Sequence, residues 1–175
     1  VSLGNGILLY FLIFTILKNI YMISHNIRER LDKDYVREQY SQGLKEYKVN
    51  LEKGNYVVSF LLISALLEER INVSWLLLEW YGTDTNLNLV NKPTQSELIG
   101  MGIKKKIKML KENDWIDKKA FEELNSLTRE RNFLIHLSLY NMKEYTNEIC
   151  ERFYAMFRII DKVSRDIKDM IDEGK

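Results

Sequence analysis

The stretch YVVSFLLISALLEERINVSWLLLEWY (Tyr56–Tyr81) decides the fold, because it is apolar on most sides of a helix and not on one stripe alone. Other elements must cover such a helix on several sides, so the stretch predicts the central helix of a bundle. Gly54-Asn55 marks the boundary before it. The run Glu68-Glu69-Arg70 interrupts the apolar sequence in its middle. These charges are either paired inside the bundle or lie in a solvated notch.

The remaining composition is typical of an all-α protein. Pro occurs once, at Pro93, and Leu and Ile are abundant, which favours long uninterrupted helices. The 175 residues suffice for one ordinary domain with a substantial core. We therefore expect an up-and-down bundle of four to six helices in residues 32–175, preceded by an apolar N-terminal helix in residues 1–31 that is a membrane anchor or an extra helix.

Hydrophobic periodicity and capping residues predict the positions of the other helices. Thr94-Gln95-Ser96-Glu97 has the form of a capping box, which opens a helix at that point. Asp117 is the expected N-cap of a later helix, with Trp115 and Ile116 holding the preceding turn against the core. The last segment has the cleanest amphipathic pattern in the chain. Together these patterns predict helices over residues 32–53, 56–81, 94–110, 118–140 and 145–170.

Charge and cysteine content exclude several kinds of function. Lys plus Arg number 26 and Asp plus Glu number 25, so no strong overall field attracts nucleic acid, and RNA binding must be local. The single Cys150 excludes an internal disulfide and a Cys-rich zinc site, and we expect it to be a small core residue. His25 and His136 are far apart, and the chain lacks HExxH and glycine-rich phosphate loops. We expect no metal and no cofactor.

The N-terminal segment is compatible with two cellular locations of the protein, the cytoplasm and a membrane surface. The apolar run Ile7–Leu17 ends at Lys18, short of the roughly 18 to 20 residues that span a membrane. Residues 6–23 would suffice if Lys18 reached the interface, and the basic residues after them would then hold the remaining chain in the cytoplasm. We expect a cytoplasmic protein, with attachment to a membrane through residues 6–23 as the alternative.

The basic run Lys104-Lys105-Lys106 lies on the helix expected over residues 94–110. These lysines are candidates for contacts with an RNA backbone. The alternative is an ordinary solvated helix face, which is how runs of charge usually behave.

The stretch TRERNFLIH (Thr128–His136) sets polar residues into an apolar run. At about 100° per residue, Arg129, Asn132 and His136 share one stripe of their helix. The apolar residues after Asn132 surround the helix, and one core cannot absorb them all. We expect a second surface, such as another subunit, to cover some of them.

Arg131 falls on the apolar stripe of the same helix, where a hydrophobic residue is usual. A charge in that position costs free energy unless it is paired. Glu68 or Glu69, on the central helix, is the candidate carboxylate.

Arg131-Asn132-Phe133-Leu134-Ile135-His136 resembles the signature of the HEPN superfamily, in which an Arg is followed after four to six residues by a His, with a polar residue next to the Arg. The lead-in Phe121-Glu-Glu-Leu124, the Asp114–Asp117 turn and the Ala65–Glu68 stretch are similar to the same family, over about residues 55–165. The resemblance implies a four- or five-helix bundle, usually a homodimer, whose Arg and His line a cleft at the subunit interface.

Many HEPN proteins are metal-independent endoribonucleases of toxin or antiviral systems. The resemblance thus implies an RNA substrate and a controlling antitoxin or other regulatory protein. His136 would act as general base or acid on an RNA 2′-OH, and Arg131 would stabilise charge on the phosphate. Asn132 would orient the imidazole or hold the phosphate, and the product would carry a 2′,3′-cyclic phosphate.

Two alternatives stay open. Arg129 also has the allowed spacing to His136 and shares its stripe, so we keep Arg129 as an auxiliary phosphate contact. The alternative to a ribonuclease is a non-catalytic helical dimer that binds a partner protein or nucleotide through the same cleft. Ser138 stands where HEPN toxins paired with nucleotidyltransferase antitoxins carry a Tyr, which counts against control by modification of that tyrosine.

Overall fold

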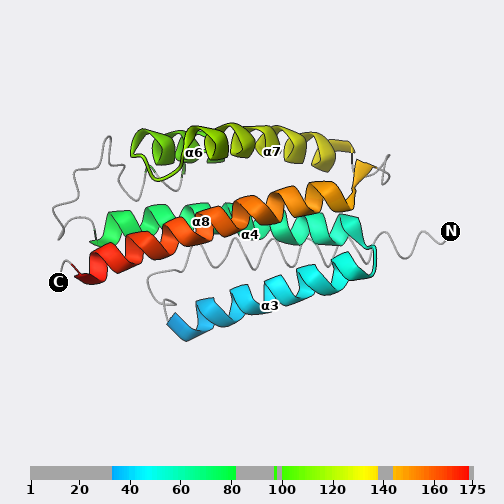
Figure 1. Ribbon diagram of the computed structural model, residues 1–175, viewed down its shortest axis with the longest axis horizontal. Helices are drawn as coiled ribbons and strands as arrows, with labels where there is room; N and C mark the ends of the chain where they lie inside the picture. The colour runs from blue at the N-terminus through cyan, green and yellow to red at the C-terminus, as the bar shows by residue number, and fades with distance from the viewer. Residues whose placement is uncertain (1–32, 82–96, 98–99, 138–143, 174–175) are drawn as a thin grey trace.

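The computed structural model describes residues 33–81, 97, 100–137 and 144–173. These residues form five helices and no strand, which confirms the all-α class (Figure 1). The N-terminal helix expected in residues 1–31 lies outside the described residues. The helices are α3 (Lys33–Glu52), α4 (Tyr56–Tyr81), α6 (Ile103–Glu112), α7 (Lys118–Leu137) and α8 (Asn147–Glu173).

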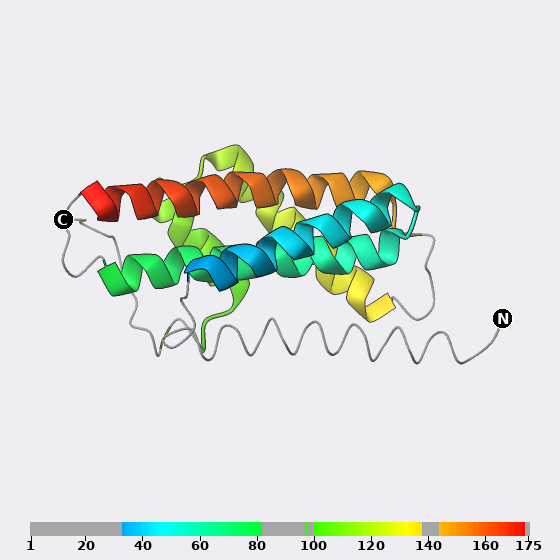
Figure 2. The ribbon, with the colours of Figure 1, turned by 90° about the horizontal axis from the view of Figure 1, so that it is seen from below.

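The central position predicted for residues 56–81 is confirmed, because α3, α6 and α8 all pack against α4. Helices α3, α4 and α8 lie side by side, whereas α6 and α7 form a layer laid obliquely across α4 and α8 (Figure 1, Figure 2). Gly54 has a φ of 71° in the turn between α3 and α4, a left-handed conformation that glycine adopts without strain. Because α7 also packs on α8, the layer covers the α4–α8 pair and carries the motif residues above it.

The core forms where these layers meet. On α4, Phe60, Ile63, Ile71 and Trp75 each have at most 1% of their surface exposed. Burial of one such side chain stabilises a fold by about 1.5–3 kcal/mol. Cys150 is fully buried, so its predicted role as a small core residue is confirmed. Other helices contribute Phe153, Phe157, Ile160 and Ile167 of α8 and Leu124 and Leu127 of α7.

Most helix boundaries agree with the expectation. Asp117 caps α7, because its Oδ1 accepts a 2.7 Å hydrogen bond from a backbone amide of the first turn. The single helix expected over residues 94–110 is wrong: Met101 and Gly102 are not helical, and α6 begins at Ile103 with Gly102 in an extended conformation before it. Glycine disfavours a helix by about 1 kcal/mol, and Gly100 directly precedes the break while Gly102 lies in it.

Of the helices in the described part of the chain, none is both long and apolar enough to cross a bilayer. α4 has the length, but the charged run in its middle interrupts the apolar sequence. The segment that the sequence offered as an alternative anchor, residues 6–23, lies outside the described residues.

Candidate functional site

The motif helix α7 lies with its apolar stripe against its neighbours. Leu124, Leu127 and Thr128 are buried, and Leu134 continues the stripe with 4% exposure. The Thr128 hydroxyl donates a 2.7 Å hydrogen bond to the Leu124 carbonyl, so this polar group is satisfied within its own helix. The stripe fixes which side of α7 faces the core and therefore which motif residues face outward.

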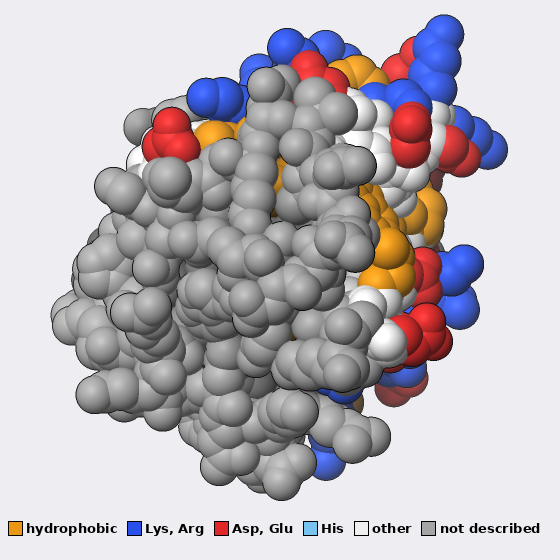
Figure 3. All heavy atoms as spheres, turned by 90° about the vertical axis from the view of Figure 1, so that its left-hand side faces the viewer, with side chains coloured by type: hydrophobic (Ala, Val, Ile, Leu, Met, Phe, Trp, Pro, Cys, Tyr) orange, Lys and Arg blue, Asp and Glu red, His pale blue; other side chains and the backbone are white. Residues whose placement is uncertain are grey.

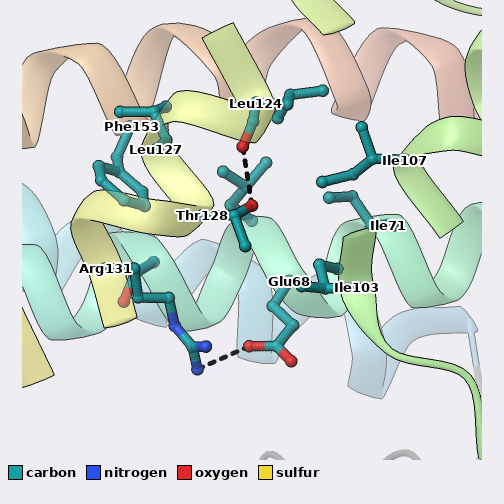
Figure 4. Close-up of a pocket in the computed structure, with 11 residues that line it drawn as sticks. Glu68, Ile71, Ile103, Ile107, Leu124, Leu127, Thr128, Arg131 and Phe153 are labelled. Carbon is teal, nitrogen blue, oxygen red and sulfur yellow. Dashed lines mark hydrogen bonds and ion pairs between the residues drawn. The ribbon is translucent and has the colours of Figure 1, made fainter. Parts of the chain in front are cut away.

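Arg131 lies on this stripe and meets a carboxylate, as its position in the sequence predicts. Its Nη2 atom lies 2.7 Å from Glu68 Oε2 of α4, beside a small pocket between the helices (Figure 4). The pocket has a volume of about 20 Å³, which is room for a water molecule and not for a nucleotide. Arg131 Nε is buried without a hydrogen-bond partner among the described residues. The two side chains are 26% and 38% exposed, so solvent reaches the pair.

Arg129 and Asn132 lie on the exposed face of α7, nearly one turn apart. Because α7 extends to Leu137, its backbone places positions 129, 132 and 136 on one face of the helix. The side chain of His136 is outside the described residues. Phe133 is 60% exposed and Ile135 39% exposed, so the apolar part of the motif reaches the surface, as expected.

The three lysines of the basic run have different surroundings. Lys104 and Lys105 are exposed, but Lys106 is buried and its Nζ donates a 2.6 Å hydrogen bond to Asn72 Oδ1 of α4. Burial also lowers the pKa of Lys106. Consecutive residues point about 100° apart on a helix, so one of three neighbours had to face the core. Lys106 therefore joins α6 to α4 and does not share the exposed surface of the other two.

Figure 3 faces the end of the molecule that carries α6. Along its edge, lysine and arginine side chains of the described residues lie among Asp and Glu side chains. Within α6 and α7, Lys108 pairs with Glu112 at 3.3 Å and Lys118 pairs with Glu122 at 3.7 Å. Any attraction for an RNA backbone at this surface is therefore local.

Glu69, the other carboxylate considered for Arg131, is buried elsewhere. It is 7% exposed, and its Oε1 has no hydrogen-bond partner within the described residues. Burial raises its pKa to about 7, although a hydrogen bond from Asn72 and the charges of Lys106 and Arg70 oppose the shift. Of the two candidate carboxylates, Glu68 is therefore the one that pairs with Arg131.

Arg70, the third charge of the run, faces α8. Its Nη2 lies 2.8 Å from Asp161 Oδ1, and its guanidinium carbon lies 3.9 Å from the centre of the Tyr40 ring of α3. One turn further along α4, the hydroxyls of Ser74 and Ser164 share a 2.6 Å hydrogen bond. Sequence reasoning missed this row of polar contacts. A serine on the apolar stripe of residues 145–170 is the signal that could have indicated it.

Comparison of the chain with models of known protein families, with curated proteins and with solved structures finds no match. Within the described residues, no three side chains of His, Cys, Asp or Glu are grouped so that they could hold a metal ion.

Replacement of Glu69 by Gln tests the burial of this carboxylate. Its pKa rises from 4.5 to about 7 on folding, so the folded protein keeps a proton that the unfolded chain releases. The free energy of unfolding of the wild type should therefore fall as the pH rises from about 5 to about 7, and level off above. Glu69→Gln should lack this fall and exceed the stability of the wild type at pH 8 by about 1–3 kcal/mol.

Urea unfolding at pH 5 and pH 8 measures this difference. Glu151→Gln, at an exposed position on α8, serves as the matched control and should keep the pH dependence of the wild type. The same fall in stability for Glu69→Gln as for the wild type would contradict the prediction.

Proposed function

We propose that this chain is a HEPN-type, metal-independent endoribonuclease that cleaves single-stranded RNA in the cytoplasm as a toxin or antiviral effector. Arg131 and His136 are its catalytic pair, Asn132 assists them, and Arg129 is an auxiliary phosphate contact. Two copies of the chain form the active unit, and a regulatory protein such as an antitoxin restrains it.

The exposed face of α7 is the observation that supports this function best. Arg129 and Asn132 are exposed at positions that share a helical face with residue 136. A guanidinium, an amide and an imidazole together can bind a phosphodiester and move a proton near neutral pH. Phe133 lies beside them with 60% of its surface exposed, and an aromatic side chain so exposed suits the core of an interface with a second copy.

In this mechanism the imidazole of His136 removes the proton from an RNA 2′-OH. The 2′-oxygen then forms a bond to phosphorus, and the bond between phosphorus and the 5′-oxygen breaks. A protonated imidazole or a water molecule supplies the proton that the leaving oxygen needs. The guanidinium groups of α7 stabilise the additional negative charge on the phosphate while this happens. The products carry a 2′,3′-cyclic phosphate and a 5′-hydroxyl.

The ion pair with Glu68 determines how Arg131 can act. With 2.7 Å between Nη2 and Oε2, the carboxylate compensates the arginine charge in the free protein. A substrate phosphate must therefore replace Glu68 as the partner of Arg131. The exchange is possible because both side chains are partly exposed and a phosphate accepts the same paired hydrogen bonds as a carboxylate.

His136→Ala tests the proposed function. The purified wild-type protein should cleave single-stranded RNA in the presence of EDTA. His136→Ala should lower the rate about 100-fold or more, because acid–base catalysis by a positioned side chain contributes about 10²- to 10⁴-fold. Gel electrophoresis of labelled RNA measures the rate, circular dichroism checks the fold, and His25→Ala is the matched control. Cleavage that requires an added metal, or full activity of His136→Ala, would sink the proposal.

Separate substitutions distinguish the two arginines. Arg131→Ala should lower cleavage about 100-fold, the usual cost of losing one group that stabilises transition-state charge. Arg129→Ala should lower it about tenfold. Glu68→Gln releases Arg131 from its carboxylate and should cleave RNA at least as fast as the wild type.

Urea unfolding of the same variants provides the control for stability. Arg131→Ala should lose about 1 kcal/mol or less, since its partner is partly exposed and can be hydrated. An inactive Arg129→Ala protein beside an active Arg131→Ala protein would reverse the two roles.

The Arg131–Glu68 pair also favours a second function, in which the helical dimer binds a partner protein or nucleotide and does not cleave RNA. Arg131 is then a structural residue whose charge is already compensated. Under this alternative the wild type shows no cleavage, and both Arg131→Ala and Glu68→Ala unfold at lower temperature.

A further inference from the structure

A buried tyrosine holds the end of α7. Tyr145 lies just before α8 and is 3% exposed, and its hydroxyl donates a 2.9 Å hydrogen bond to the backbone carbonyl of Leu134. Its ring packs edge-on against Phe60 of α4, with the ring centres 5.1 Å apart. One side chain therefore connects the last turn of α7 to the start of α8, which meet at one end of the molecule, and to the central helix (Figure 1).

The position of the accepting carbonyl makes this hydrogen bond important. Leu134 lies in the last turn of α7 that the structure describes, which ends at Leu137. A buried hydroxyl that donates to a backbone carbonyl restrains the backbone of that turn. Further upstream, Arg152 of α8 holds α7 by ion pairs with Glu123 at 2.8 Å and with Glu130 at 3.0 Å.

We propose that Tyr145 is the positioning residue for His136, and the catalytic part of this inference rests on the function proposed above. Leu134 lies between Arg131 and His136 in the sequence. Its hydrogen bond thus fixes the turn that carries these residues relative to α4 and to the start of α8. A displacement of about 1 Å at a reacting group can lower a rate about 100-fold. Loss of the Tyr145 hydroxyl therefore lowers kcat for RNA cleavage by about 10- to 100-fold and leaves KM nearly unchanged.

Tyr47 provides a matched control. Its hydroxyl is also buried and also donates to a backbone carbonyl, that of Cys150, at 3.3 Å. This hydrogen bond connects α3 to α8, so Tyr47→Phe removes the same atom from the same kind of interaction without acting on the motif helix. Each substitution lowers the thermal midpoint by about 2–4 °C.

The experiment compares the full-length wild type, Tyr145→Phe and Tyr47→Phe by NMR and by RNA cleavage. The chain has two histidines, and the imidazole signals of His136 are those missing from the spectrum of His136→Gln. In Tyr145→Phe the chemical shifts and the titration curve of His136 change. Amide hydrogen exchange of residues 134–137 also becomes about tenfold faster or more in this variant. Tyr47→Phe keeps the wild-type values of both.

The NMR result and the cleavage result separate this inference from the proposed function. Unchanged His136 signals and unchanged amide exchange in Tyr145→Phe, or equal changes in Tyr47→Phe, overturn the positioning role even if the wild type cleaves RNA. Altered His136 signals in a protein that cleaves no RNA support the positioning role and refute the ribonuclease. If Tyr145→Phe does not fold, amide hydrogen exchange in the wild type provides the test. The positioning role of Tyr145 is overturned if the amides of residues 134–137 exchange as fast as those of a frayed helix end.

Discussion

Three consecutive charges in the middle of a buried helix constrain the whole bundle. Glu68, Glu69 and Arg70 point about 100° apart around α4, so no single neighbouring helix can meet all three. Glu68 reaches Arg131 of α7, and Arg70 reaches Asp161 of α8. α4 thus contacts both helices through charged side chains, and a shift of either helix by one turn would leave a partly buried charge without its partner.

These ion pairs contribute less to stability than the apolar core does. Partly exposed pairs contribute roughly 0–1 kcal/mol, whereas each large apolar side chain buried on α4 contributes about 1.5–3 kcal/mol. Glu69 works against stability, since burial without a full set of partners disfavours its charged form and raises its pKa to about 7. The same geometry also brings Glu68 to the motif, so the carboxylate that pairs with Arg131 is the one a substrate phosphate would have to replace.

Local sequence signals predicted the helices and their ends better than they predicted the contacts between side chains. The bounds of Tyr56–Tyr81 and the Asp117 cap follow from residues next to each other in the chain. A charge on an apolar stripe predicted that Arg131 pairs with a carboxylate of α4, but it did not distinguish Glu68 from Glu69. The burial of Lys106 depends on how α6 is rotated against α4, which a run of three lysines does not reveal. The hydrogen bond from Tyr145 to Leu134 could not be predicted either. Periodicity shows only that a tyrosine faces inward and not which carbonyl its hydroxyl reaches.

A ribonuclease that uses the 2′-hydroxyl as its nucleophile leaves characteristic ends on its products, whichever arginine assists the histidine. The most direct measurement is therefore the chemical identity of the ends that the wild-type protein produces from single-stranded RNA in EDTA, determined by mass spectrometry. We expect a 2′,3′-cyclic phosphate and a 5′-hydroxyl, and no cleavage after a nucleotide whose 2′-hydroxyl is replaced by hydrogen. A 3′-hydroxyl with a 5′-phosphate, or cleavage after the 2′-deoxy nucleotide, would contradict the proposed mechanism.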